Sequence, residues 1–171
     1  MRSIWVPLDE SERTKWNFVP LTNVGPLQFG MSYDEVVAAL GGVGPAPYLW
    51  RRQAQFREPA VTTYYGESET LSCVAVDALH GPQVTMDGIR LVGRVPSELE
   101  QQFADYAASH GVTVRYGQHG DPGAEELGLV LRAQRAGDVL LTRPVFVAWE
   151  WADRVGDVSE GPIPQEEWSQ R

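Results

Sequence analysis

The sequence is poor in cysteine, lysine and histidine, and each scarcity narrows the classes of protein it encodes. Cys73 is the single cysteine, which excludes an internal disulfide framework and favours a reducing compartment. Lys15 is the single lysine, and the arginine bias is typical of a GC-rich bacterial genome. The three histidines, His80, His110 and His119, stand beside turn residues or at a helix end, where no ligand is needed.

Long apolar runs and basic clusters are also missing. No apolar run approaches the roughly 20 residues of a membrane-spanning helix. The first residues reach a proline at Pro7 and then turn acidic, unlike a signal peptide. A formal net charge of −9 repels nucleic acid and anionic membranes and attracts a basic partner. We therefore expect a cytoplasmic bacterial protein that binds neither nucleic acid nor membrane.

Two helix starts share one pattern, which is the most informative local feature of the chain. Each has a serine as the predicted N-cap, a glutamate three residues later and a glycine after the last apolar position. Ser32 precedes a helix predicted over 33–40, and Ser97 precedes one predicted over 98–109. Replacing either serine by alanine is predicted to lower the free energy of unfolding by about 0.5–2 kcal/mol.

Strand patterns follow both helices. Asp87-Gly88 between two apolar segments is a strong signal of a two-residue hairpin. Residues Val145 and Val147 alternate with Phe146, which predicts side chains on opposite faces of a strand. The predicted strands are 60–65, 70–76, 83–86, 89–92, 112–116, 127–133 and 139–151.

The order of these elements predicts an α+β fold, with two short-to-medium helices packed on antiparallel sheet. Residues 1–24 are expected to form an irregular arm, with one or two short extended pieces, that aromatic side chains hold in place. Residues 25–155 are expected to form one domain, with two helix-plus-meander half-units at 25–92 and 93–155. Residues 156–171, rich in proline, glycine and glutamate, are expected to be an acidic C-terminal tail.

The segment from Gly25 to Gly41 resembles a helix-start motif of known bacterial families. Its apolar-Gly-Met-Ser phrase, followed by valine and then Leu-Gly, is similar to the motif in β-lactamase inhibitor proteins and SmpA-type outer-membrane lipoproteins. Those families place short helices against antiparallel sheet and act by binding other proteins, so the resemblance implies that fold and that kind of function. Those relatives are exported, and some are disulfide-bonded, whereas this sequence shows neither a signal peptide nor a cysteine pair. The motif residues are Phe29, Gly30, Met31, Ser32, Glu35, Val36, Leu40 and Gly41.

Catalytic and metal-binding patterns are incomplete, so we expect no enzyme, cofactor or metal. Cys73 lies in an apolar strand, where a thiol packs in the core, and the nucleophile alternative pairs it with His80. A metal alternative groups His119 and Asp121 with the glutamates that follow, but no known ligand spacing is present. A small hydrolase therefore stays a remote alternative.

The most specific expectation is a non-catalytic protein-binding module, in its sharpest form an immunity-type inhibitor of a basic toxin. Its carboxylates would take the place of a nucleic-acid backbone and steer association. The alternative is a small-ligand-binding protein with an aromatic-lined sheet face. The candidate partner-binding residues are Glu98, Gln101, Gln102 and Asp105 on the second helix, Asp121, Glu125 and Glu126 in the following loop, and Trp149 and Trp151.

Overall fold

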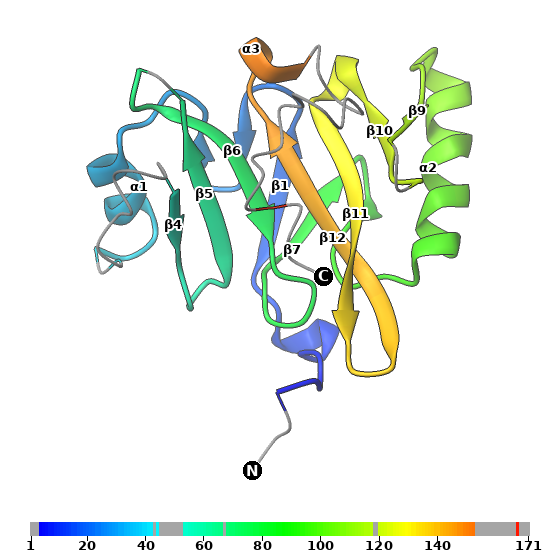
Figure 1. The fold of residues 1–171 in the computed structure, drawn as a ribbon, viewed down its shortest axis with the longest axis horizontal. Coiled ribbons are helices and arrows are strands. Elements are labelled where there is room, and N and C mark those ends of the chain that lie inside the picture. Colours follow the sequence, from blue (N-terminus) through cyan, green and yellow to red (C-terminus); the bar gives the residue numbers. More distant parts are fainter. Residues whose placement is uncertain are drawn as a thin grey trace.

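The computed structural model describes residues 4–42, 44, 53–66, 68–117, 120–152 and 167, with the backbone alone at 151 and 152. Its strands form two sheets that pack against one another, and the two main helices flank the larger sheet at opposite ends (Figure 1). The predicted α+β class, with two main helices and largely antiparallel sheet, is confirmed. The division of the strands into two stacked sheets was not predicted.

The smaller sheet has five strands, and its centre comes from the N-terminal region. In β1, Trp16 and Phe18 occupy alternate positions and point into the core. β1 pairs in parallel with β7, whereas the other neighbouring strands are antiparallel. Residues 15–24, expected within an irregular arm, therefore belong to the folded domain. The strand order is β3 (Leu27–Gln28), β2 (Asn23–Val24), β1 (Lys15–Val19), β7 (Gln83–Met86) and β8 (Ile89–Arg90).

The hairpin predicted between β7 and β8 is confirmed. Asp87 and Gly88 have φ angles of 48° and 83°. Positive φ at both central positions is what a type I′ turn requires, and this turn matches the twist of the flanking strands. Local sequence therefore determines this part of the small sheet.

The larger sheet has seven strands and is buried on both faces at its centre. All side chains of β5 and β6 are buried, which suits their continuous β-branched and apolar sequence. Phe146 points toward the smaller sheet, where its ring centroid lies 4.6 Å from that of Phe18. Val145 and Val147 point the other way and pack with Tyr64, as the alternation predicted. The strand order is β4 (Gln53–Gln55), β5 (Val61–Tyr65), β6 (Leu71–Val76), β12 (Val139–Val147), β11 (Leu129–Ala136), β10 (Pro122–Ala124) and β9 (Arg115–Tyr116).

The first helix, α1 (Tyr33–Ala39), begins as predicted. The backbone N–H of Glu35 donates to the Ser32 hydroxyl at 3.2 Å, and the Ser32 N–H donates to the Glu35 carboxylate at 3.2 Å. These two reciprocal bonds form a capping box. They satisfy backbone donors that the first turn of a helix leaves without intrahelical partners.

The second helix, α2 (Pro96–His110), begins earlier than predicted, and Ser97 is not its N-cap. Val95 occupies the N-cap position and makes no side-chain capping bond. Pro96 is the first helical residue, where its fixed φ suits the helix and its missing N–H costs nothing. Ser97 therefore lies inside the first turn. The C-terminal end agrees with prediction, because Gly111 adopts a left-handed φ of 67°.

This difference between the two serines leads to a stability prediction. Ser32→Ala removes a capping hydroxyl and should lower the free energy of unfolding by about 0.5–2 kcal/mol. Ser97→Ala removes no cap and should stay within about 0.5 kcal/mol of the parent chain. Urea denaturation of both variants measures the difference. Equal losses at the two positions would contradict the capping assignment.

The last predicted strand is too long at its C-terminal end. β12 stops at Val147, and Trp149–Ala152 form the short helix α3. Beyond the bond from the Ala148 N–H to the Ser72 carbonyl, the next residue of β6 is Leu71, whose backbone N–H and carbonyl are bonded to Met31 and Gly30 instead. The backbone therefore bonds within a helical turn. Two 3-10 turns complete the described elements, η1 (Glu10–Glu12) and η2 (Glu125–Leu127), and none of the described helices is long and apolar enough to span a membrane.

Candidate functional site

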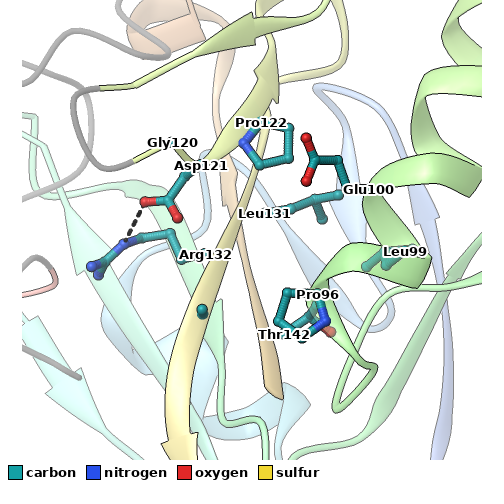
Figure 2. Close-up of a pocket in the computed structure, with 10 residues that line it drawn as sticks. Pro96, Leu99, Glu100, Gly120, Asp121, Pro122, Leu131, Arg132 and Thr142 are labelled. Carbon is teal, nitrogen blue, oxygen red and sulfur yellow. Dashed lines mark ion pairs between the residues drawn. The ribbon is translucent and has the colours of Figure 1, made fainter. Parts of the chain in front are cut away.

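A groove of about 180 Å³ lies between the first turns of α2 and strands β10 and β11 (Figure 2). Leu99 of α2 and Leu131 of β11 are buried residues that line it from two sides. Glu100 points toward Pro122, and Asp121 lies on the other side of this proline (Figure 2). The groove therefore combines apolar walls with two carboxylates.

One edge of β11 borders this groove. Among the described residues, β10 pairs with β11 only at Leu129 and Val130, whereas β11 continues to Ala136. Leu131 and Ala133 line the groove beyond this short pairing. A strand that extends past its neighbour offers backbone groups to which an extended peptide can add as a further strand.

The two carboxylates of the groove have different surroundings. The Tyr116 hydroxyl is hydrogen bonded to Glu100, and burial together with this carboxylate raises the pKa of Tyr116. The Asp121 carboxylate lies 3.6 Å from the Arg132 guanidinium. A neutral hydroxyl does not neutralise Glu100, whereas Arg132 balances Asp121. Glu100 is therefore the main source of negative potential in the groove.

The four candidates on the second helix form one exposed stripe of α2. Gln101 donates to Asp105 at 3.0 Å, and Arg94 donates to Gln102 at 3.0 Å. Glu98 is exposed. Because Leu99 and Phe103 are the buried side of the helix, this stripe faces solvent and leaves Glu100 to face the groove.

The loop candidates do not form one cluster. Asp121 is half-buried in its ion pair, and the Glu125 carboxylate lies 3.3 Å from the Arg115 guanidinium. The exposed Glu126 accepts a bond from the Thr113 backbone N–H. Each carboxylate thus holds a different part of the β9–β10–η2 segment, and Asp121 alone lines the groove.

The two tryptophan candidates lie on α3 rather than on a sheet face. Trp149 is 72% exposed, and the Trp151 side chain lies outside the described residues. Phe18, Tyr64 and Phe146 of the sheets are buried, whereas Tyr116 on the edge strand β9 is 54% exposed. Trp149 therefore lies on a helix and not on the aromatic-lined sheet face that was expected.

The catalytic alternatives meet physical obstacles. Cys73 is fully buried, as expected for a packing thiol, and burial raises its pKa well above the usual value. The nucleophilic thiolate is therefore disfavoured at neutral pH. His80 lies in an exposed turn beside Asp77. His119 lies outside the described residues, and within those residues no three His, Cys, Asp or Glu side chains form a potential metal site.

Sequence reasoning missed a polar cluster on the outer face of the larger sheet. Arg132 and Arg143 are directly paired across β11 and β12, and both are buried. Their signal was present, because each arginine has the strand parity of a buried valine on this outer face, Val130 or Val145. A charged residue at a core position of a strand requires a buried counter-charge.

Comparison with known proteins gives no match to a protein-family model, to a curated protein or to a solved structure.

Proposed function

We propose that this chain is a non-catalytic protein-binding module and that its groove beside α2 receives an extended, basic segment of a partner protein. The observation that carries the proposal is the position of Glu100 beside the strand edge at Leu131 and Ala133. The partner's backbone pairs with this edge, and a lysine or arginine side chain reaches Glu100. The apolar walls bury the alternate side chains of the segment.

The net charge of −9 supports the choice of a basic partner. Long-range attraction raises the rate of encounter, and the exposed stripe of α2 with Glu98 and Asp105 adds to this field. The groove then fixes the register of the partner segment and provides apolar contacts, which long-range attraction alone cannot do. Steering and docking thus belong to two neighbouring surfaces of the same helix.

The sharpest form of the proposal is an immunity-type inhibitor of a basic bacterial toxin, such as a nuclease. Acidic side chains then occupy the toxin surface that otherwise binds the phosphate backbone. A toxin encoded next to this gene, whose product arrests growth unless the chain is co-expressed, would establish this form. Growth arrest that persists during co-expression would reject it and leave the wider protein-binding proposal standing.

The groove is tested by selecting random displayed peptides against the full chain. We expect enriched peptides to carry lysine or arginine alternating with apolar residues, as an added strand requires. Glu100→Lys should weaken their binding about tenfold or more, which corresponds to about 1.4 kcal/mol. Affinity should also fall as salt rises, because exposed charges are screened over about 10 Å at 0.1 M ionic strength.

Glu98→Lys is the matched control, since it makes the same change in net charge on the same helix. If the groove is the binding site, Glu98→Lys changes affinity several-fold less than Glu100→Lys. A larger effect of Glu98→Lys would move the site to the exposed stripe of α2. Enrichment of acidic peptides, or of none, would contradict the proposal.

A further inference from the structure

The buried arginines on the outer face of the larger sheet stand in an arrangement that requires an anion. Arg132 and Arg143 face each other across β11 and β12, and they are 2% and 4% exposed. Like charges in directly opposed positions repel one another. The residue that lies against both is Glu167, which is fully buried although it is far along the chain.

Glu167 is bound through its side chain and its backbone at once. Arg143 donates from Nε to one carboxylate oxygen and from Nη2 to the other, the latter at 3.0 Å. The Tyr64 hydroxyl donates to the carboxylate at 2.7 Å. Arg132 donates from Nη1 to the Glu167 main-chain carbonyl. The site therefore binds the glutamate through its main-chain carbonyl as well as through its carboxylate.

The third nitrogen of the Arg143 guanidinium, Nη1, contacts groups other than Glu167. It donates to Gln134 at 3.0 Å and lies 3.8 Å from the Asp77 carboxylate. Asp77 is itself fixed by the backbone N–H groups of Leu79 and His80, at 2.9 and 2.8 Å. These contacts leave the Nε–Nη2 edge of Arg143 facing the site, in the geometry that binds a carboxylate with two bonds.

Arg132 has a similar support, because the Asp121 carboxylate lies 3.6 Å from its Nε. Both arginines thus keep a counter-charge when Glu167 is absent. A binding group that its surroundings orient in advance loses little freedom when a ligand arrives.

From this geometry we propose that Tyr64, Arg132 and Arg143 form a receptor for a glutamate of an acidic peptide, which Glu167 fills within its own chain. A partner segment that carries a glutamate exchanges with Glu167 at this receptor. The site has the opposite polarity to the groove beside α2. The two sites share the Asp121–Arg132 pair, but the receptor rests on the contacts of Glu167 and not on the function proposed above.

The test uses the full chain with Glu167→Ala and, as a matched control, Glu166→Ala. A labelled peptide with the sequence of residues 163–171 should bind the Glu167→Ala chain at least about tenfold more tightly than the parent chain, where the resident glutamate competes. The Glu166→Ala chain should behave as the parent does. A peptide with glutamine in place of Glu167 should bind neither chain measurably.

Acetate gives a second readout, which reports on the carboxylate-binding part of the site. The melting temperature of the Glu167→Ala chain should rise in sodium acetate above its value in sodium chloride of equal ionic strength, because acetate enters the vacated site. The parent and the Glu166→Ala chains should show no such difference. Folded Glu167→Ala chain that does not bind the peptide would overturn the proposal, whether or not acetate stabilises it.

If Glu167→Ala does not fold, Glu167→Gln, which keeps the side-chain length and an acceptor for Tyr64, takes its place in the peptide titration. Failure of both variants to fold would show that Glu167 is a permanent part of the core, and this outcome also overturns the exchange.

Discussion

Phe146→Ala should lower the free energy of unfolding by about 3–5 kcal/mol, the usual cost of truncating a buried phenylalanine. Phe146 is fully buried, and its ring meets that of Phe18 at a centroid distance of 4.6 Å, where the two sheets pack together. Alanine removes the ring and leaves a cavity that two hydrogen-bonded sheets cannot close easily. For a chain of this size we expect the melting temperature to fall by roughly 6–20 °C.

Val139→Ala is the control, since Val139 lies on the same strand but is 58% exposed. Its effect should remain within about 0.5 kcal/mol. Urea denaturation measures the free energy of unfolding of both variants. A loss in Phe146→Ala alone comes from lost packing, whereas a loss in both comes from a weakened strand. A loss below about 1 kcal/mol for Phe146→Ala would mean that the sheets do not depend on this contact.

The sequence predicted elements that are decided within a few residues. The Asp87-Gly88 turn, the Ser32 capping box and the Gly111 helix end all rest on bonds between near neighbours, and the structure confirms each one. The prediction that Ser97 is the N-cap of α2 was wrong because two local signals compete at this helix start. Pro96 suits the first helical position so well that the helix begins before the serine reaches the N-cap.

Long-range pairing could not be predicted in this way. The parallel register of β1 with β7 places Trp16 opposite Val84, far along the chain. Strand periodicity shows which side chains share a face, but it does not show which strand lies beside which. For this reason the sequence predicts only short extended pieces of an arm over 15–24, whereas β1 lies at the centre of a sheet.

The candidate sites likewise include one that local sequence predicts and others that only the tertiary fold brings together. The exposed stripe of α2 with Glu98 and Asp105 followed from helical periodicity. The groove required the strand edge of β11 to come beside the helix, which only the tertiary fold determines. The Arg143–Glu167 contact joins strand β12 to a residue near the C-terminal end, and the tail pattern gave no sign of a buried carboxylate there.

Arg13→Met should destabilise the chain by about 3 kcal/mol, because it removes the donors of a buried network. The Arg13 guanidinium is buried and donates to the backbone carbonyls of Gly81 at 2.8 Å, Ala78 at 2.7 Å and Leu79 at 3.3 Å. Methionine retains most of the side-chain volume but bonds to none of these carbonyls, so each loses a partner without access to bulk water.

Lys15→Met is the matched comparison, since it also removes a cation near the N-terminus but from an exposed position. Its effect should stay within about 0.5 kcal/mol. Amide hydrogen exchange adds a local readout, because the Leu8 N–H donates to the Leu79 carbonyl in the same network. Loss of the Arg13 donors should speed exchange at Leu8 more than at the α2 amides, which lie outside the network. Equal stability of the Arg13→Met and Lys15→Met chains would show that water replaces the guanidinium and that the loop carbonyls are not sealed from solvent.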